Sequence, residues 1–337
     1  MPRRRLSEQR PRANVSSNSA GGSARHVRGW RVSRVLKPRR SCLSVPGSSA
    51  RMQAKAATLA ADQVLFDLED ATAPSEKVSA RAVVVESLRS LDLGGRAVAV
   101  RVNGTDTQWC YRDVVEVVEP AGERIDTVIL PKVESSADVI FLDRLLGQIE
   151  LARGWPPGRI GIEVLIESSA GLQQVDAIAA ASARLEALIF GPGDLSASLG
   201  MGQLTIGTLD SDWHYAWMRI LVAARTNALL AIDGPFAAFA DLEGLERSAR
   251  RTAALGFDGK WVIHPGQIET VNRVYSPDPA TYARAEGILA AYRQATEGEG
   301  RGAVRFEGEM IDEATRKMAE AVARRGRWLG LPQPPPT

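Results

Sequence analysis

Short apolar runs alternate with helix-length segments along residues 40–263. Each run is rich in Val, Ile, Leu or Ala, and most of them end at a polar residue. These runs predict eight strands, at 41–45, 63–68, 96–102, 127–130, 160–166, 187–190, 228–232 and 260–263. Between them, apolar residues recur three and four positions apart, which predicts helices that include 81–90, 136–152, 172–183, 213–227 and 242–255.

Strands that alternate with helices form a parallel sheet, because a chain returning to the next parallel strand needs a long crossover. Eight such units over about 220 residues predict a (β/α)₈ TIM barrel, which we assign to residues 39–275. An open doubly wound sheet is the alternative. It is disfavoured because no Gly-x-Gly-x-x-Gly sequence follows the first predicted strand.

Residues 276–330 follow the barrel and predict a helical extension. Helical patterns cover 282–295 and 313–328, and the Gly-rich stretch 296–302 between them predicts a flexible linker. Such a linker would allow the last helix to move over a site as a lid. The alternative is that the extension packs on the barrel wall. The Pro-rich residues 331–337 predict an irregular coil.

The amino-terminal segment differs in composition from the rest of the chain. Residues 1–40 contain 12 of the 42 Lys and Arg residues and a single acid, Glu8. A Ser-, Gly- and Arg-rich segment without apolar periodicity cannot bury enough surface to fold, so residues 1–38 are predicted to be disordered. A functionless extension is the favoured interpretation, ahead of a mitochondrial transit peptide and a nucleic-acid-binding arm. Aromatic residues do not interleave with the basic ones, so we expect no nucleic-acid partner.

The amino-acid composition limits the cellular compartments in which we expect the protein. The apolar share of 45% is sufficient for a large core, and no run of 18 apolar residues predicts a membrane span. Cys42 and Cys110 are isolated and lack the spacing of a metal site, which is typical of a reducing compartment. We therefore expect a cytoplasmic protein without a membrane partner, or a mitochondrial protein if the tail is a transit peptide.

Two neighbouring predicted strands each end at a carboxylate. Glu167 follows the run 160–166, and Asp194 follows the run 187–190 after Gly-Pro-Gly. Adjacent parallel strands would bring the two acids to the same end of the sheet, where they repel each other unless a cation lies between them. Mg²⁺ suits the pair, since it takes one or two carboxylates and leaves other positions to water and substrate. The alternative is that each acid caps the helix after its strand.

The other predicted strands also end in polar residues. In a TIM barrel these positions converge on one mouth that carries the chemistry. The acids at these ends are Asp67, Glu69, Asp70 and Asp233, and the counter-charges are Arg101, Lys132 and His264. Such a density of acids favours a bound cation. Lys132 could also indicate a Schiff-base aldolase, but a paired strand-end charge is the favoured interpretation.

Nine short motifs occur in order along residues 40–325, and together they resemble the HpcH/HpaI aldolase and citrate lyase beta-subunit family. The similarity is to its stand-alone CoA-ester lyases of the malyl-CoA lyase type. The motifs are Val45-Pro-Gly-Ser48 with Arg51 and Lys55, Phe66-Asp-Leu-Glu-Asp70, Arg101-Val-Asn-Gly104, Leu130-Pro-Lys-Val133, Ile166-Glu-Ser168, Phe190-Gly-Pro-Gly-Asp194, Ala231-Ile-Asp-Gly-Pro235, Lys260-Trp-Val-Ile-His-Pro265 and Gly308-Glu-Met-Ile-Asp312.

The resemblance implies a magnesium-dependent enzyme, with Mn²⁺ as an alternative ion, that makes or cleaves a carbon–carbon bond in a 3-hydroxyacyl-CoA. It implies Glu167 and Asp194 as metal ligands, and Glu69 and Asp70 as partners of metal-bound water. Arg101 would bind the small oxo-acid, a role that suits a guanidinium because it grips a carboxylate through two hydrogen bonds.

The resemblance also implies how coenzyme A binds and how the subunits assemble. Arg51 and Lys55 would meet the phosphates of CoA, and Ile263 and Pro265 its adenine end. Gly193 would line the substrate site beside the metal ligand that follows it. Asp312 would reach the site from a neighbouring subunit of a homotrimer or homohexamer and transfer a proton to or from carbon.

The acyl group remains open at this point. Residues 200–212 form a shorter loop than is frequent among malyl-CoA lyases, which leaves malyl-, methylmalyl-, citramalyl- and citryl-CoA as candidates. A (3S)-malyl-CoA thioesterase is one alternative function. Another is a citrate lyase beta subunit that works in a complex on a carrier-protein thioester.

Overall fold

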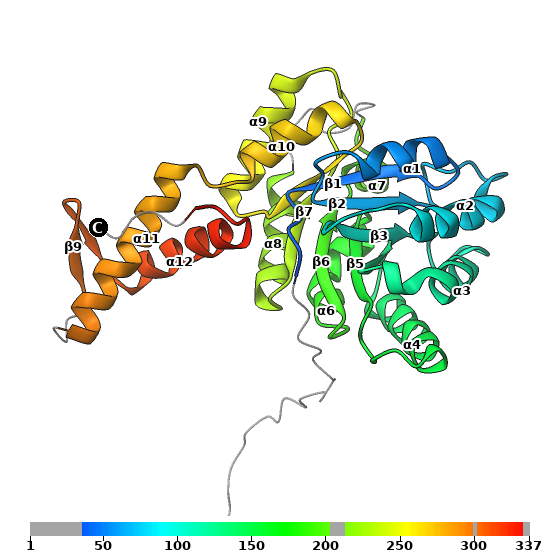
Figure 1. Cartoon of the computed structure of the whole chain (residues 1–337), viewed down its shortest axis with the longest axis horizontal. Helices are drawn as coiled ribbons and strands as arrows, with labels where there is room; N and C mark the ends of the chain where they lie inside the picture. Colours follow the sequence, from blue (N-terminus) through cyan, green and yellow to red (C-terminus); the bar gives the residue numbers. More distant parts are fainter. Residues whose placement is uncertain (1–35, 203–212, 299–301, 333–337) are drawn as a thin grey trace, which may run out of the picture.

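The computed structural model describes residues 36–202, 213–298 and 302–332, and Figure 1 shows how their elements are arranged. Eight parallel strands close into a barrel in chain order, with β1 paired to β8. The strands are β1 (Ser41–Pro46), β2 (Gln63–Asp67), β3 (Ala97–Arg101), β4 (Thr127–Leu130), β5 (Gly161–Ile166), β6 (Leu185–Phe190), β7 (Leu230–Asp233) and β8 (Gly259–Val262). The predicted (β/α)₈ barrel is confirmed.

The strands are buried on both faces, as expected for a parallel sheet covered by helices. Their outer faces pack against the surrounding helices in a large apolar cluster. The barrel interior holds a second apolar cluster, which includes Leu65, Ala99 and Leu165. Because side chains alternate along a strand, the residue two positions after each of these also points inward, at the carboxyl end of the barrel.

The amino-terminal end of the barrel interior is polar and buried. Glu163 Oε1 accepts hydrogen bonds from Arg39, Gln63 and Thr127 at 3.2, 2.7 and 2.8 Å. Arg39 also pairs with Glu186 at 3.1 Å. Such buried charges are tolerated because they are paired. The network fills this end of the barrel, so the carboxyl end is the one available for chemistry.

Helices surround the barrel largely where the periodicity predicts them. The longer ones are α2 (Lys77–Ser90), α3 (Cys110–Ala121), α4 (Ser136–Arg153), α8 (His214–Thr226) and α9 (Leu242–Leu255). Shorter helical segments are α1 (Ala50–Ala57), α5 (Ser169–Gln173), α6 (Val175–Ala179), α7 (Pro192–Ser198), α10 (Ile268–Val274) and the 3₁₀ turns Gly122–Arg124 and Pro265–Gln267. The single helix predicted at 172–183 was wrong, since Gln174 departs from helical dihedral angles (φ −100°, ψ 11°) and separates α5 from α6.

Residues 279–332 form a unit of their own, which we call the C-terminal arm. It contains α11 (Pro279–Arg293), a π-helical turn (Gln294–Gly298), the strands β9 (Val304–Phe306) and β10 (Glu309–Ile311), and α12 (Glu313–Trp328). The hairpin was not predicted. Its two-residue loop, Glu307 and Gly308, has positive φ at both positions, which is the geometry of a type I′ turn.

The helices of the arm share a small core. Tyr282 and Ile288 of α11 pack with Ala319 and Ala323 of α12. At the closest point, a Cβ atom added to Gly326 would lie 2.4 Å from the ring of Tyr282. In the structure α12 packs against α11, so a movement of α12 alone as a lid would have to break this core.

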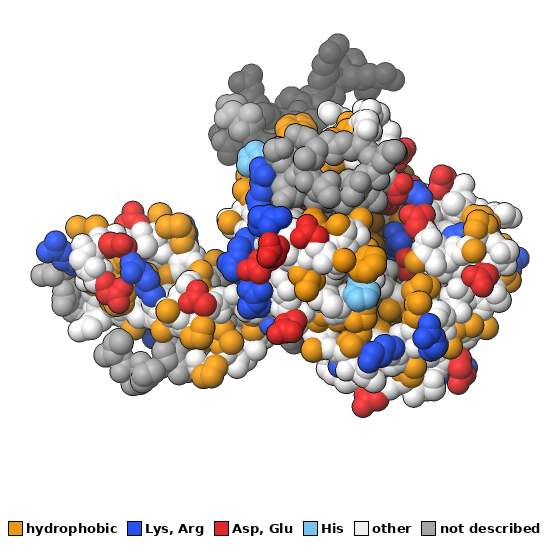
Figure 2. All heavy atoms as spheres, turned by 90° about the horizontal axis from the view of Figure 1, so that it is seen from above, with side chains coloured by type: hydrophobic (Ala, Val, Ile, Leu, Met, Phe, Trp, Pro, Cys, Tyr) orange, Lys and Arg blue, Asp and Glu red, His pale blue; other side chains and the backbone are white. Residues whose placement is uncertain are grey.

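The arm joins the barrel at the amino-terminal ends of the strands. Trp328 Nε1 donates to the carbonyl of Leu36, just before β1, at 2.7 Å, and Arg325 pairs with Asp258, just before β8, at 2.9 Å. In Figures 1 and 2 the arm and the barrel are two masses joined by a narrow neck, with the β9–β10 hairpin far from the barrel. The described part of the arm thus neither lies along the barrel wall nor reaches the mouth of its own barrel.

Several predicted features fall wholly or mainly outside the described residues. These are the basic tail, the short loop after residue 202, the centre of the Gly-rich linker and the Pro-rich end. Within the described ranges, every helix is too short or too polar to cross a lipid bilayer.

Substitution of Gly326 by Ala should destabilise the arm by roughly 1–3 kcal/mol, because the new methyl group would force α12 away from the Tyr282 ring. Urea unfolding followed by tryptophan fluorescence would measure the loss. Gly302→Ala is the matched control, since an added Cβ there meets nothing within 4 Å. Equal stability of the two variants would contradict the close α11–α12 packing.

Candidate active site

Three ionisable side chains meet at the carboxyl end of the barrel interior. Asp67 ends β2, Arg101 ends β3, and Glu167 directly follows β5. Each lies two residues beyond an inward-facing apolar residue, so strand alternation directs all three into the barrel. Their exposed fractions are 0%, 6% and 4%, respectively. Active sites of TIM-barrel enzymes form at this end of the fold.

A bidentate ion pair with Asp67 holds the guanidinium of Arg101. Nε donates to Asp67 Oδ1 at 2.8 Å, and Nη2 donates to Oδ2 at 2.5 Å. Nη1 lies 3.0 Å from Glu69 Oε2, and the ring of Trp261 is 5.1 Å from the guanidinium carbon. These contacts fix the plane of the guanidinium. Asp67 was predicted as one of the mouth acids, but its role as the anchor of Arg101 was not.

Glu69 links Arg101 to Lys132. Lys132 Nζ lies 2.5 Å from Glu69 Oε1 and 3.6 Å from Asp70 Oδ1. Burial opposes the charged form of Lys132, but the hydrogen bond and the charge of Glu69 outweigh it and raise the pKa of the lysine. A lysine held protonated in this way is a poor Schiff-base nucleophile. The geometry agrees with a paired strand-end charge.

The backbone on both sides of Glu167 positions its carboxyl group. Lys132 has a φ of 53°, a left-handed conformation that costs a non-glycine residue roughly 1 kcal/mol. In this conformation its N–H donates to Glu167 Oε1 at 2.7 Å. Gly191 approaches from the other side, and a Cβ atom there would lie 2.7 Å from Glu167 Oε2. The left-handed conformation of Lys132 and the absence of a Cβ atom at Gly191 therefore place Glu167 between β4 and β6.

Burial raises the pKa of Glu167 to about 8. Arg101 and the N–H of Lys132 oppose the shift, whereas the negative charges of Asp194 and Glu69 add to it. The carboxyl group thus tends to hold a proton at neutral pH unless a cation faces it. A divalent cation would favour the ionised form and lower this pKa.

Asp194 lies in the first turn of α7 and is half-buried. Among the described residues its carboxylate has no hydrogen-bond or ion-pair partner, although its charge acts on Glu167 and Lys132. The alternative that the two acids are helix caps was wrong. Ser168 caps α5 through a hydrogen bond from the Gly171 N–H, and α7 has no side-chain cap.

The donor set of the mouth fits Mg²⁺. Five carboxyl groups face two cations there: Asp67, Glu69, Asp70, Glu167 and Asp194 against Arg101 and Lys132. The described residues contain no group of three or more His, Cys, Asp or Glu side chains arranged as a metal cage. A hard cation held by two carboxylates and completed by water and substrate needs no such cage. The uncommitted carboxylate of Asp194 beside Glu167 is the observation that supports this fit.

A buried polar network lies behind the loop that follows β2 and carries Glu69. It was not predicted from the sequence. Lys77 Nζ donates to two carbonyls of this loop, at 3.1 and 3.0 Å, and to Asn103 Oδ1 at 2.6 Å. Asn103 is bound in turn to Asp113, which pairs with Arg81 at 2.8 Å. The network holds the loop that presents Glu69. Lysine is seldom buried, so a lysine in a helical segment carries no sequence signal of this role.

Two residues predicted at the mouth lie elsewhere. Asp233 is on the outer face of β7, where it pairs with Lys260 at 2.5 Å and accepts from Thr252 at 3.1 Å. The side chain before it points inward, so alternation turns Asp233 outward. His264 is exposed and stacks on Phe239 with ring centroids 5.0 Å apart. Neither residue takes part in the charge balance of the mouth.

The residues predicted to meet CoA are accessible. Arg51 and Lys55 are one turn apart on α1 and exposed, and neither side chain has an ion-pair partner within the described ranges. Ile263 is 44% exposed, and Pro265 is exposed beside it. Gly193 lies in the first turn of α7. Their contact with a ligand stays a prediction.

Asp312 lies in the arm, at the start of α12. Its carboxylate accepts a hydrogen bond from the Thr315 N–H at 2.9 Å, and this bond lowers its pKa. The helix has 16 residues and is therefore about 24 Å long, and its other end docks at the amino-terminal end of the barrel. Asp312 does not join Glu167 and Asp194 within one chain.

Comparison with known proteins identifies the family. The sequence pattern of the HpcH/HpaI aldolase/citrate lyase family matches residues 40–265, which include the whole barrel and its mouth. The chain belongs to this family. The resemblance inferred from the nine motifs is confirmed, and the relatives at 40–42% identity are carbon–carbon lyases.

Two relatives differ in the reaction that their names state. An L-malyl-CoA/beta-methylmalyl-CoA lyase of Cereibacter sphaeroides is 41% identical over 307 residues, covering 87% of this chain and 96% of the relative. A (3S)-malyl-CoA thioesterase of the same species is 36% identical over 276 residues, covering 82% of this chain and 90% of the relative.

A solved structure shares the architecture. Protein CitE from Mycobacterium tuberculosis, in complex with magnesium, acetoacetate and coenzyme A, matches with a TM-score of 0.66 and 32% sequence identity. The match covers 86% of this chain and 98% of the other.

Substitution of Asp67 by Asn should lower the free energy of unfolding by roughly 3 kcal/mol, because Arg101 would stay buried without its main counter-charge. Chemical denaturation monitored by circular dichroism would measure the change. Asp176→Asn is the matched control, since its exposed pair with Arg219 should contribute less than about 1 kcal/mol. If the two variants lost the same stability, Asp67 would not be the anchor of the mouth.

Proposed function

We propose that this chain is a magnesium-dependent CoA-ester lyase that makes or cleaves the carbon–carbon bond of malyl-CoA or β-methylmalyl-CoA. The observation that carries the proposal is one mouth that combines an acid pair, Glu167 and Asp194, with a clamped guanidinium, Arg101. These substrates present a hydroxyl group and a carboxylate on adjacent carbons, which suit a cation and a guanidinium. The relative at 41% identity, a lyase named for both substrates, supports this choice of acyl group.

Glu167 and Asp194 would hold the ion. When bound, Mg²⁺ supplies Lewis acidity toward the hydroxyl oxygen of the substrate. Mn²⁺ is the alternative, since it accepts similar oxygen ligands. Glu69 and Asp70 would accept hydrogen bonds from water in the remaining positions. The complex of the related CitE protein with magnesium supports the same choice of ion.

Arg101 would bind the carboxylate of the oxo-acid part. Asp67 already occupies Nε and one N–H of Nη2, and Glu69 lies 3.0 Å from Nη1, so the second N–H of Nη1 and the second N–H of Nη2 are the donors left for a ligand. A guanidinium fixed before substrate arrives loses little conformational freedom on binding. Lys132, paired with Glu69 at 2.5 Å, would hold the carboxyl group of that acid in place beside the ligand.

The reaction requires two proton movements. In the cleavage direction the hydroxyl group gives up its proton, the carbon–carbon bond breaks, and the oxo-acid leaves with a new carbonyl group. The bonding electrons stay on the α-carbon of the acyl-CoA, which then takes a proton. Asp312 from a neighbouring subunit is our candidate for the group that exchanges this second proton. Its distance from its own mouth supports a role in another subunit.

Arg51 and Lys55 would bind the phosphates of CoA, and Ile263 and Pro265 would contact its adenine. Two cations one helical turn apart, without an ion-pair partner in the part of the chain that the structure describes, suit a polyphosphate, and the exposed apolar residues suit a flat ring. Gly193 would allow the thioester end to approach Asp194. Free CoA esters rather than carrier-protein thioesters are therefore our preferred substrates, against the alternative of a citrate lyase beta subunit.

A thioesterase acting on (3S)-malyl-CoA is the second candidate function. It is favoured by the relative at 36% identity that carries this name. The same mouth could bind the substrate, but water would attack the thioester and the carbon–carbon bond would stay intact. We also propose a homotrimer or homohexamer and a cytoplasmic location, with a mitochondrial one as the alternative.

Incubation with malyl-CoA and Mg²⁺ should release glyoxylate and acetyl-CoA, because the lyase breaks the carbon–carbon bond. Parallel incubations with methylmalyl-, citramalyl- and citryl-CoA would assign the acyl group. Glu167→Gln and Asp194→Asn should each lower turnover at least a thousandfold without unfolding the protein, and Asp176→Asn should retain it. Release of free CoA thiol without an oxo-acid would support the thioesterase, and full activity in excess chelator would refute the metal site.

Mixing Asp312→Ala with Glu167→Gln subunits should restore part of the activity that each variant lacks alone. Mixed oligomers would contain sites that combine one intact mouth with one intact arm. The measurement is turnover after subunit exchange, with exchange verified by differently sized tags. Mixed oligomers that have exchanged subunits and remain inactive would show that Asp312 does not serve a neighbour.

A further inference from the structure

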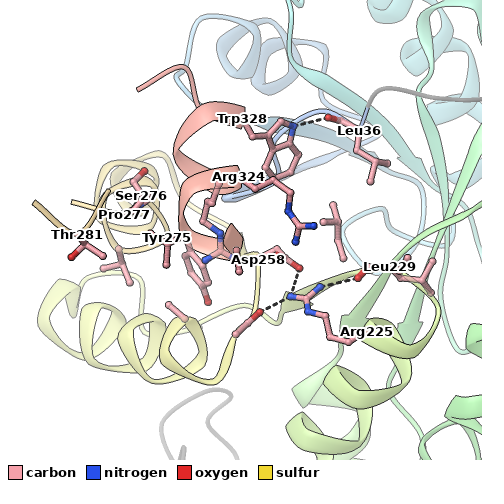
Figure 3. A pocket seen from close by; sticks show the side chains of 18 residues that line it. Leu36, Arg225, Leu229, Asp258, Tyr275, Ser276, Pro277, Thr281, Arg324 and Trp328 are labelled. Carbon is pink, nitrogen blue, oxygen red and sulfur yellow. Dashed lines mark hydrogen bonds and ion pairs between the residues drawn. The ribbon is translucent and has the colours of Figure 1, made fainter. Parts of the chain in front are cut away.

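A cavity of about 820 Å³ lies in the neck between the barrel and the arm, at the end of the barrel opposite the active site (Figure 3). Leu230, Asp258 and Tyr275 contribute to its barrel side, and Arg324 and Trp328 of α12 contribute to its arm side. Pockets for small ligands typically measure about 300–1,000 Å³. The volume is therefore sufficient for a small organic molecule.

The apolar walls of this neck cavity are held in place. The indole N–H of Trp328 donates to the carbonyl of Leu36 at 2.7 Å, which fixes the ring over the cavity. The hydroxyl group of Tyr275 shares a hydrogen bond of 2.7 Å with Thr252, and its ring is buried. Leu230 completes this surface and is also buried. The cavity thus offers a preformed apolar surface to a ligand.

The charge of the neck cavity is positive and only partly neutralised. Asp258 accepts from Arg225 at 2.8 Å and from Arg325 at 2.9 Å, so its carboxylate is already shared by two guanidinium groups. Arg324 extends from α12 into the cavity in Figure 3 and has no hydrogen-bond or ion-pair partner among the described residues. One cation therefore remains available in a pocket whose other charged side chains are paired with one another.

We propose that the neck cavity binds a small organic anion with one carboxylate or phosphate group and an apolar body. The anionic group would pair with Arg324, and the apolar body would lie against Trp328, Leu230 and Val274. A guanidinium at the edge of a low-polarity pocket binds such a group strongly. Residues 1–35 of the chain itself do not suit the site, since they contain nine arginines and one acid.

Binding there would couple the arm to the barrel. The ligand would contact α12 on one side and the ends of β7 and α10 on the other. It would stabilise the neck by an amount that rises with the logarithm of one plus the ratio of its concentration to its Kd. Amide hydrogens of 321–328 should then exchange more slowly with solvent.

Fluorescence titration of the full chain with 8-anilinonaphthalene-1-sulfonate, an aromatic anion, tests the proposal. Coenzyme A is present at saturation so that the proposed CoA site is occupied. We expect one site that Arg324→Ala weakens at least tenfold, as loss of a charge-assisted hydrogen bond requires. Arg324→Lys should retain part of the affinity, and Ala321→Trp should block the site by filling the cavity. Lys317→Ala, which removes a cation of the same helix outside the cavity, should bind as the native chain does.

Competition would identify the anionic group. 4-Phenylbutyrate and phenyl phosphate should displace the probe, and the stronger competitor shows whether a carboxylate or a phosphate is preferred. The uncharged 4-phenylbutanamide should fail to compete. Equal probe affinity in the native, Arg324→Ala and Ala321→Trp chains, at unchanged oligomeric mass, would overturn the proposal. Because these variants lie away from the mouth, that result would leave the proposed lyase activity untouched.

Discussion

The buried ion pair between Asp67 and Arg101 is the contact on which the mouth of the barrel depends. The two residues stand directly opposite each other on β2 and β3, so the register of the sheet brings the carboxylate to the guanidinium. Arg101 then holds Glu69, and Glu69 holds Lys132. The two cations are thereby engaged by Asp67 and Glu69, so neither forms an ion pair with Glu167 or Asp194. This distribution supports the proposal that Glu167 and Asp194 hold a cation.

The two ends of the barrel differ in their polar contacts and in what packs against them. At the amino-terminal end, Arg39 and Glu163 form a closed network, and the arm docks there through Trp328. At the carboxyl end, Asp67 and Glu69 are paired with Arg101 and Lys132, whereas Asp194 has no hydrogen-bond or ion-pair partner among the described residues. Because the arm leaves from the closed end, Asp312 lies about a helix length farther from the barrel than Trp328. A site that combined Glu167 with Asp312 would therefore have to draw on two subunits, as we propose.

Backbone geometry contributes as much to the site as side-chain chemistry does. Lys132 accepts a left-handed conformation so that its N–H reaches Glu167, and Gly191 lacks the side chain that would collide with the same carboxyl group. Strain of this kind persists only where the surrounding structure holds it, and it is typical of functional sites. Behind the loop, Lys77 uses its ammonium group to tie down the segment that carries Glu69.

The sequence by itself determined the eight strands, because a strand covered on both faces must be apolar along its length and must stop at a polar residue. It also indicated that Glu167 and Asp194 lie at the same end of the barrel, because each of them follows the end of such a strand. What it left open depends on contacts between distant residues. A shift of one position turned Asp233 out of the mouth, and a hydrogen bond across 292 residues, from Trp328 to Leu36, decided where the arm docks. Only the tertiary structure could decide these, since local apolar periodicity carries no information about which distant surface a helix end will meet.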